Sequence, residues 1–327
     1  MISIVMATYN GEKYLQQQLD SIAAQTVLPN ELIVGDDCST DNTIKILENF
    51  KNKVGFTVKI YRNKANVGYI KNFARVILEA NGDYVFLCDQ DDYWFSNKIE
   101  TVINFFKDNP GMQIIAHNAM CTDSNLVSLG KTLFEYDISR GLEYGSAMHG
   151  FVTCVRKDFL KYATPIPYSY SFDGWLYYLS SEMKVRYVLD EVLGYYRRHD
   201  KAVTFDTIGK NQSFIEATKK RILKNIKNIK FIHSMESINA HFAPKAATLE
   251  FVRKIKVNKE LPDWVDVELL NKLECSSQKE VELFKARYKA MSVNGLARLR
   301  RILSAYKKGV YNNFHGFRTA FDDLFRC

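Results

Sequence analysis

The chain has 327 residues, of which 46% are hydrophobic and 13% aromatic, and these values describe a globular protein with a substantial core. No apolar run approaches the ~18–20 residues of a membrane-spanning helix. The net charge of +8 is unevenly distributed: residues 1–204 hold 21 Lys and Arg against 24 Asp and Glu, whereas residues 205–327 hold 24 against 13. We therefore predict a mildly acidic body, residues 1–204, joined to a basic tail, residues 205–327.

The cysteines and the first residues bear on the compartment. The six cysteines are scattered and include no CxxC pair, which is typical of reduced thiols in a cytoplasmic protein. Residues 1–10 are apolar at first but short, and they lack a basic leader, so no signal peptide is predicted. We expect a cytoplasmic protein.

Apolar runs and helical periodicity alternate along the body. Strands are expected at residues 2–7, 32–34, 56–61 and 84–88. Helices are expected at residues 12–24, after the Ser39-Thr40-Asp41 cap, and between Gly68 and Ala80. Continuous apolar strands alternating with helices predict an α/β fold with a mostly parallel sheet covered on both faces.

Polar residues follow three of these strands. They are Thr8-Tyr9-Asn10, Asp36-Asp37 and the segment Asp89-Gln90-Asp91-Asp92. In open parallel sheets, ligands bind at the carboxyl ends of the strands. We therefore expect a ligand site at this edge.

The acidic segment needs a compensating charge or water. Asp89, Asp91 and Asp92 directly follow a buried strand, where like charges repel one another. A hard divalent cation such as Mg²⁺ or Mn²⁺ prefers carboxylate oxygens, and Asp89 and Asp91 could both reach it. A solvated loop is the alternative, because many surface loops carry a D-x-D. An EF-hand is disfavoured because Trp94 stands where that loop requires glycine.

Four stretches within residues 2–100 together resemble a known enzyme family. They are SIVMATYNGEKYLQQQLDSIAAQT, ELIVGDDCSTDNT, NVGYIKNF and GDYVFLCDQDDYW. Their order and spacing resemble the family 2 glycosyltransferases, inverting and metal-dependent sugar-nucleotide enzymes with the GT-A fold. DQDD followed by Trp94, and the later YYRRHDKAVT, are similar to bacterial rhamnosyltransferase-like members. The resemblance implies a Rossmann-like GT-A catalytic domain in residues 1–204, followed by an all-helical basic region in residues 205–327.

The resemblance implies a nucleotide pocket at the strand ends. Thr8 and Tyr9 would line it, and Asp37 or its neighbour Asp36 would accept the N3–H of uracil or thymine. Lys71 lies where the family often has arginine, and it keeps the charge without the planar fork. An Asp-rich turn at residues 36–37 could equally cap a helix.

The metal assignment also follows from the resemblance. Asp89 would approach the ribose or the metal, and Asp91 would bind the cation that holds the diphosphate. His199 would be a further metal ligand or a diphosphate contact, with Arg197 or Arg198 beside it. Arg198 is also a candidate contact for the acceptor or the sugar. A histidine after a strand is also commonly structural.

The acceptor side would carry the general base. Asp173, in SYSFDGWLYYLS, resembles the catalytic acid of the family, although it could instead be the N-cap of the following helix. His149 and Gly150 fall where relatives form the wall of the acceptor pocket. Trp94 and Trp175 would offer flat apolar surfaces to sugar rings, or they could simply be core residues.

Two amphipathic stripes mark the tail. The first contains Ile215, Ile222, Ile226 and Ile229, and the second contains Leu296, Leu299, Ile302, Leu303 and Tyr306 beside several arginines and lysines. Such helices pack on the body or on each other. The last ~40 residues are also compatible with an anionic membrane surface, at the inner face of the cell membrane, or with a homodimer.

These observations predict an inverting glycosyltransferase for bacterial surface polysaccharide. Its donor would be a UDP- or dTDP-sugar, with rhamnose as one candidate, and its acceptor a glycan or lipid-linked glycan. A nucleotidyltransferase is disfavoured because TYNGEKYL contains one glycine and no Gly-rich phosphate loop. A nucleic-acid-binding protein is disfavoured by the aliphatic stripes of the tail, and a non-catalytic relative by the presence of Asp91 and Asp173.

Overall fold

The computed structural model describes residues 1–145, 149–167, 171–199, 235–292, 295–312 and 320. The chain divides into two compact units, one of Met1–Phe205 with Asn258–Asp266 and one of Asp206–Val257 with Val267–Cys327. The segment Asn258–Asp266 is attached to the first unit by Trp264. The indole nitrogen of Trp264 donates to Asp158 Oδ2 at 2.6 Å, and its ring packs on Phe159 and Tyr162.

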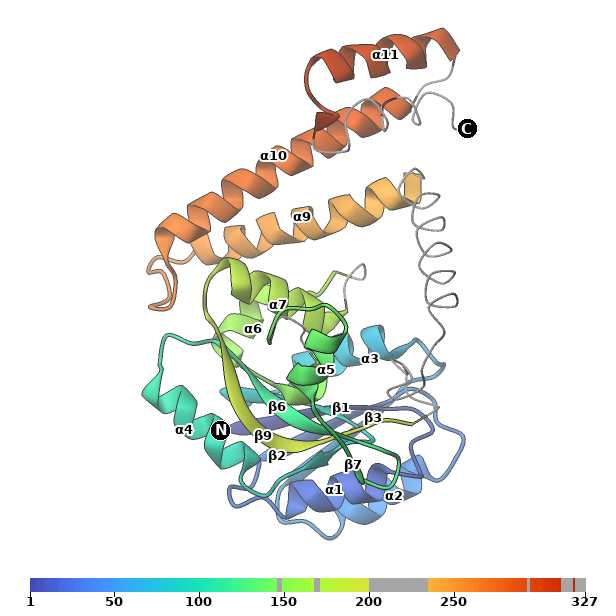
Figure 1. The fold of residues 1–327 in the computed structure, drawn as a ribbon, viewed down its shortest axis with the longest axis vertical. Helices are drawn as coiled ribbons and strands as arrows, with labels where there is room; N and C mark the ends of the chain where they lie inside the picture. The colour runs from blue at the N-terminus through green and yellow to red at the C-terminus, as the bar shows by residue number, and fades with distance from the viewer. Residues whose placement is uncertain (146–148, 168–170, 200–234, 293–294, 313–319, 321–327) are drawn as a thin grey trace. The chain divides into compact units, whose positions relative to one another are not determined.

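The described residues of the first unit form one nine-stranded sheet in the order β3-β2-β1-β4-β8-β6-β9-β5, with β7 paired to β6 (Figure 1). The strands are β1 (Ile2–Thr8), β2 (Glu31–Asp36), β3 (Thr57–Arg62), β4 (Tyr84–Asp89), β5 (Tyr93–Trp94), β6 (Ile114–Thr122), β7 (Ser128–Thr132), β8 (Thr153–Arg156) and β9 (Arg186–Arg197).

The sheet is parallel in its first half and mixed in its second. β1 pairs in parallel with β2 and β4, and β2 pairs in parallel with β3. β8 then inserts antiparallel between β4 and β6, while β6 and β9 are parallel. The α/β prediction is confirmed, and the mostly parallel arrangement holds for β1–β4.

Helices cover both faces of the sheet (Figure 1). They are α1 (Leu15–Ala23), α2 (Thr43–Lys51), α3 (Tyr69–Val76), α4 (Lys98–Asp108), α5 (Leu133–Ser139), α6 (Lys157–Ala163) and α7 (Phe172–Glu182), with 3₁₀ turns η1 (Ile77–Glu79) and η2 (Gly150–Val152). On one face, Ile4 and Met6 of β1 share a core with residues of α1, α2 and α4. Leu15, Leu19 and Ile22 of α1 recur at helical spacing and are fully buried there.

The described part of the second unit contains α9 (Met235–Lys256), α10 (Val267–Met291) and α11 (Gly295–Lys307). Helix α11 buries Ile302 and Ala305 against Ala290 of α10. The prediction that Leu296, Leu299, Ile302, Leu303 and Tyr306 form one apolar stripe is wrong in part. Leu303 and Tyr306 are 50% and 38% exposed and lie outside the buried face. The stripe of Ile215, Ile222, Ile226 and Ile229 lies outside the described residues.

None of the described helices combines the length and the hydropathy that crossing a bilayer requires.

A buried carboxylate at the start of β2 predicts a pH-dependent stability. Burial alone would raise the pKa of Glu31, but hydrogen bonds from Lys59 (2.8 Å), Ser3 (2.6 Å) and Asn81 (2.7 Å) lower it to about 2. Because the pKa is lower in the folded state, the stabilisation is complete above the unfolded pKa of about 4.5 and is lost as the pH falls from there toward 2. Its size is about 3 kcal/mol.

Glu31→Gln is therefore expected to destabilise the protein by about 2–3 kcal/mol at pH 7 and by much less at pH 3. Urea unfolding at the two pH values measures this difference. The matched control is Glu48→Gln on the exposed side of α2, which should leave stability nearly unchanged. An equal loss at both pH values would contradict the ionic origin of the effect.

Candidate active site

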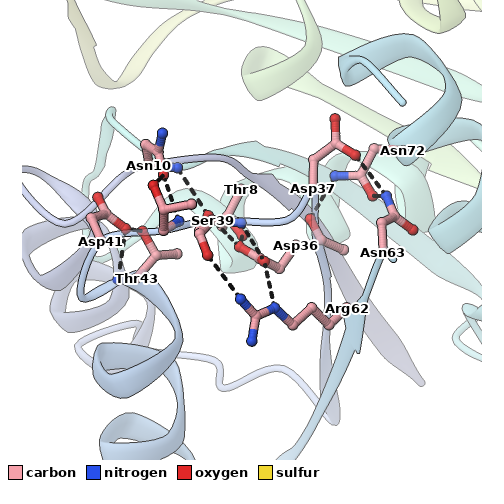
Figure 2. A network of polar contacts seen from close by, with 12 residues as sticks. Thr8, Asn10, Asp36, Asp37, Ser39, Asp41, Thr43, Arg62, Asn63 and Asn72 are labelled. Carbon is pink, nitrogen blue, oxygen red and sulfur yellow. Dashed lines mark hydrogen bonds and ion pairs between the residues drawn. The ribbon is translucent and has the colours of Figure 1, made fainter. Parts of the chain in front are cut away.

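Asp36 organises the end of β2 (Figure 2). Its fully buried carboxylate accepts hydrogen bonds from Thr8 Oγ1 at 3.1 Å, from the Ser39 backbone N–H at 2.9 Å and from the Ser39 hydroxyl. Arg62 Nε lies 3.8 Å from the same group. These contacts tie the ends of β1, β2 and β3 together at one edge of the sheet.

Asp37 performs a similar task for the following loop. Its carboxylate accepts hydrogen bonds from Asn63 Nδ2, Val67 N and Gly68 N, each at 2.8 Å (Figure 2). Asn42 is the N-cap residue of α2, so neither Asp36 nor Asp37 caps that helix and the capping alternative is wrong.

The predicted nucleotide residues differ in accessibility. Thr8, Asp36 and Asp37 are at most 2% exposed and use their polar atoms on protein partners, so they shape the strand ends rather than forming an open surface. Tyr9 is 47% exposed. Lys71 lies on the exposed side of α3. Contact of any of these five with a nucleotide stays a prediction.

Gln90 joins the end of β1 to the acidic segment. Its side chain accepts from Tyr9 N at 3.0 Å and donates to Tyr9 O at 3.1 Å. A Cβ on residue 11 would lie 2.2 Å from Gln90 Oε1, so a glycine at this position leaves room for the Gln90 side chain that makes these two hydrogen bonds. The loops after β1 and β4 are therefore fixed to one another.

The carboxylates of the acidic segment are held in a partly buried environment. Burial, together with the nearby carboxylates of Asp91 and Asp173, raises the pKa of Asp89 to about 7. Asp92 is buried and accepts from Arg197 N at 2.9 Å, and burial followed by its acidic neighbours raises its pKa well above the usual value. Arg197 Nε also donates to Asp91 O at 2.7 Å, so the end of β9 supports this segment.

The end of β9 also brings two predicted metal residues together. His199 Nε2 lies 2.8 Å from Asp91 Oδ2, although the two residues are 108 positions apart. His199 is 9% exposed, and its ring centroid lies 4.7 Å from that of Tyr14. Among the described residues, His199 Nδ1 and Asp92 Oδ2 are buried without a hydrogen-bond partner.

A carboxylate oxygen and an imidazole nitrogen at one point fit a divalent cation that takes its other ligands from phosphate and water. Within the described part of the chain, no group of three His, Cys, Asp or Glu side chains is arranged to hold a metal unaided.

Asp173 lies near Asp89 at the start of α7. Ser171 is the N-cap of this helix and accepts from Gly174 N, so the alternative role of Asp173 as N-cap is wrong. Partial burial and the charges of Asp173 and Asp89 raise the pKa of Tyr69, which indicates that these three groups share one environment.

His149 and Gly150 form the adjoining wall. His149 Nε2 lies 3.0 Å from Oδ2 of the fully buried Asp137. A Cβ on Gly150 would come within 3.3 Å of the Phe172 ring and 3.9 Å of Asp89 Oδ2, so this glycine permits close approach of the wall to the acids. The guanidinium of Arg198 lies 5.0 Å from the Tyr196 ring centroid and donates to the Tyr196 hydroxyl at 2.7 Å.

Comparison with known proteins identifies the family of the N-terminal half of the chain. Residues 3–161 match the family model described as Glycosyl transferase family 2. The chain therefore carries a family 2 glycosyltransferase domain.

Two curated relatives share part of the glycosyltransferase domain. A dTDP-rhamnosyl transferase, RfbG of Shigella flexneri, is 35% identical over 127 residues, which are 38% of this chain and 41% of RfbG. The poly(ribitol-phosphate) beta-N-acetylglucosaminyltransferase TarS of Staphylococcus aureus is 38% identical over 94 residues, which are 28% of this chain and 16% of TarS. The chain thus spans less than half the length of these curated relatives.

A solved structure extends the likeness in fold. The crystal structure of S. aureus TarS 1–349 in complex with UDP-GlcNAc aligns with a TM-score of 0.50 and 18% identity, covering 88% of this chain and 91% of that one. The mixed α/β sheet of the glycosyltransferase domain is accordingly a GT-A fold.

The expected sugar-stacking role of two tryptophans is corrected. Trp94 is 1% exposed and packs against Phe86, and Trp175 is 1% exposed and donates its indole N–H to Ala163 O at 2.7 Å. Both rings belong to the interior of the first unit. They therefore offer no open surface to a sugar, and the core alternative holds.

The sequence does not single out two charged groups around the site. Asp137 and Lys98 are buried; Asp137 contacts His149, and Lys98 donates to Phe151 O. Neither stands in a sequence pattern that marks it, because Asp and Lys are ordinarily exposed.

Proposed function

We propose that the domain is an inverting glycosyltransferase that moves a sugar from a UDP- or dTDP-sugar to a hydroxyl group of a glycan. The observation that carries this proposal is the meeting of Asp91 with His199 beside the Asp89–Asp173 pair. A cation near one carboxylate would stabilise the departing diphosphate, and a second carboxylate could accept the acceptor proton, which together suit a sugar-nucleotide transfer. RfbG is named a dTDP-rhamnosyl transferase, which supports a dTDP-sugar as donor. TarS was solved in complex with UDP-GlcNAc, which supports a UDP-sugar.

Asp91 and His199 would hold a divalent cation, Mn²⁺ or Mg²⁺, with Asp89 close to the ribose or the cation. When bound, the cation would supply positive charge to the departing diphosphate. Tyr9 and Lys71, which are accessible, would contact the nucleotide, and Asp37 would accept from its base.

Asp173 would act as the general base. The acceptor oxygen forms a bond to the anomeric carbon while the bond from that carbon to the diphosphate oxygen breaks, and the acceptor proton passes to Asp173. Attack opposite the leaving group inverts the configuration at that carbon. His149, Gly150 and Arg198 would border the acceptor or the transferred sugar, with Asp137 fixing the orientation of His149.

The acceptor would be a glycan of a bacterial surface polysaccharide, free or lipid-linked, reached from the cytoplasmic side. Leu303 and Tyr306 are exposed on α11 among basic residues, which suits either an anionic membrane surface or a second copy of the chain.

Calorimetric titration with UDP and with dTDP, each with and without Mn²⁺, tests the proposal. We expect Mn²⁺-dependent binding of at least one nucleotide, and the preferred base then identifies the donor class. GDP serves as the mismatched control. If neither UDP nor dTDP binds with Mn²⁺ present, the proposed donor and cation are wrong.

A further inference from the structure

Tyr9, the residue after β1, combines a fixed main chain with an accessible side chain. Its N–H donates to Gln90 Oε1 at 3.0 Å, and its carbonyl oxygen accepts from Gln90 Nε2 at 3.1 Å. The residue is nevertheless 47% exposed, and within the described part of the chain no ring contact or hydroxyl hydrogen bond engages its side chain. The orientation of the Tyr9 ring therefore depends strongly on how its main chain is held.

The next residue is held by a second strand end. Asn10 has a left-handed backbone conformation, with φ 47°, and its N–H donates to Ser39 Oγ at 2.9 Å (Figure 2). The side-chain oxygen of Asn10 accepts from Thr40 N, also at 2.9 Å. Asparagine tolerates this conformation better than most residues, and these two hydrogen bonds keep it there. The loop after β2 thus fixes Asn10, and Gln90 fixes Tyr9.

The residue at position 11 decides whether the Gln90 amide can occupy its place. Beyond its neighbours in the chain, a Cβ built on Gly11 would have three atoms of this amide as its nearest contacts, at 2.2, 2.6 and 3.3 Å. The first two distances are shorter than any real contact of a Cβ, so a side chain at position 11 would displace the amide. Because the amide ends a flexible side chain, it could swing away, and both hydrogen bonds to Tyr9 would then break.

We propose that Gln90 is a positioning residue for the nucleotide: by binding both main-chain polar groups of Tyr9, it presents the Tyr9 ring to the ligand in a preset orientation. This inference rests on the proposed function, in which Tyr9 contacts the nucleotide. A ring that is fixed beforehand loses less conformational freedom on binding than a mobile one, so the affinity is higher.

A link that merely joined two loops would behave differently. Its loss would disturb the fold or the neighbouring Asp89 and Asp91, and the effect on nucleotide binding would not depend on the Tyr9 ring. Two double-mutant cycles separate the two roles. One combines Gln90→Ala with Tyr9→Ala, and the other combines it with Gly11→Ala, which reaches the same hydrogen bonds without changing a residue of the acidic segment.

The test is calorimetric titration of the full-length chain at pH 7 with UDP and with dTDP, each with saturating Mn²⁺. We expect Gln90→Ala and Gly11→Ala each to weaken nucleotide binding about three- to tenfold, as the loss of orienting hydrogen bonds does. The two changes together should weaken it no more than Gln90→Ala alone, because the amide that a Cβ at position 11 would displace is then absent. Tyr9→Ala should weaken binding about fivefold or more, and adding Gln90→Ala to it should cause little further loss.

Two matched controls should bind both nucleotides like wild type. Gln16→Ala removes an exposed glutamine whose amide donates to Asp20 on α1 at 2.8 Å. Gly55→Ala adds a Cβ that would meet no atom within 4 Å. Circular dichroism and thermal unfolding establish that each variant is folded.

Wild-type affinity in a folded Gln90→Ala or Gly11→Ala variant would overturn the inference and leave the proposed function intact. Losses that add in full between Gln90→Ala and Tyr9→Ala would do the same, because Gln90 would then act independently of the ring. If the wild type bound neither UDP nor dTDP, the proposed function would fail, and the inference with it.

Discussion

Asp173→Asn is expected to lower kcat for sugar transfer by about 10²- to 10⁴-fold while leaving Mn²⁺-dependent nucleotide binding within about twofold. The amide has nearly the same shape as the carboxylate but cannot accept the acceptor proton. Asp173 lies in the first turn of α7 beside Asp89, and it is not the capping residue, so the substitution should preserve the helix. Initial rates with the donor identified by calorimetry provide the measurement.

Two controls separate chemistry from structure at α7. Glu182→Gln removes a carboxylate from the exposed end of the same helix and should not change kcat. Ser171→Ala removes the capping hydroxyl and should cost about 1 kcal/mol of stability with little effect on kcat. If the Asp173→Asn variant retained more than about a tenth of the wild-type kcat, another residue would have to be the general base.

Asp91→Asn is expected to abolish the Mn²⁺ dependence of nucleotide binding and to lower kcat/KM by about 10²-fold or more. The carboxylate provides a charged oxygen ligand, and it also contacts His199 at 2.8 Å, so its loss removes one ligand and releases the other. His199→Gln should weaken Mn²⁺ binding in the same direction but less, because it removes only the nitrogen ligand. Calorimetry with and without Mn²⁺ measures both effects.

The matched control for this pair is Asp108→Asn at the exposed end of α4. It removes the same charge from an exposed position outside the acidic segment. Wild-type Mn²⁺ dependence in Asp91→Asn would assign the cation to other residues, and a similar loss in Asp108→Asn would indicate a non-specific charge effect.

The parallel half of the fold was predictable because its signals are local. The strands at residues 2–7 and 84–88 are continuous apolar runs, and the polar residues after them lie at one edge because parallel strands end together. The insertion of β8 between β4 and β6 was not predictable in this way. It depends on pairing of segments far apart in the chain, for which a short run such as residues 153–156 gives no register.

The candidate site shows the same division. That Asp91 follows a buried strand is a sequence pattern, whereas its contact with His199 arises from the pairing of β5 and β6 with β9. The sequence leaves two roles open for Trp94 and Trp175, because large aromatic rings suit both a core and a carbohydrate surface, and only the fold decides between them. The burial of Lys98 has no sequence signal, because a lysine at the start of a helix ordinarily reaches solvent.

The contacts of Trp264 affect where the chain can be truncated to obtain the first unit alone. The ring is 9% exposed against Phe159 and Tyr162, and its indole N–H is bonded to Asp158, which lies in the helix after β8. A fragment cut after residue 204 would lack that ring, would present the two aromatic side chains to water and would leave Asp158 Oδ2 without its indole donor, while Oδ1 kept its ion pair with Lys161. The smallest self-sufficient catalytic fragment is therefore not a simple N-terminal piece, and expression boundaries need to lie beyond Asp266.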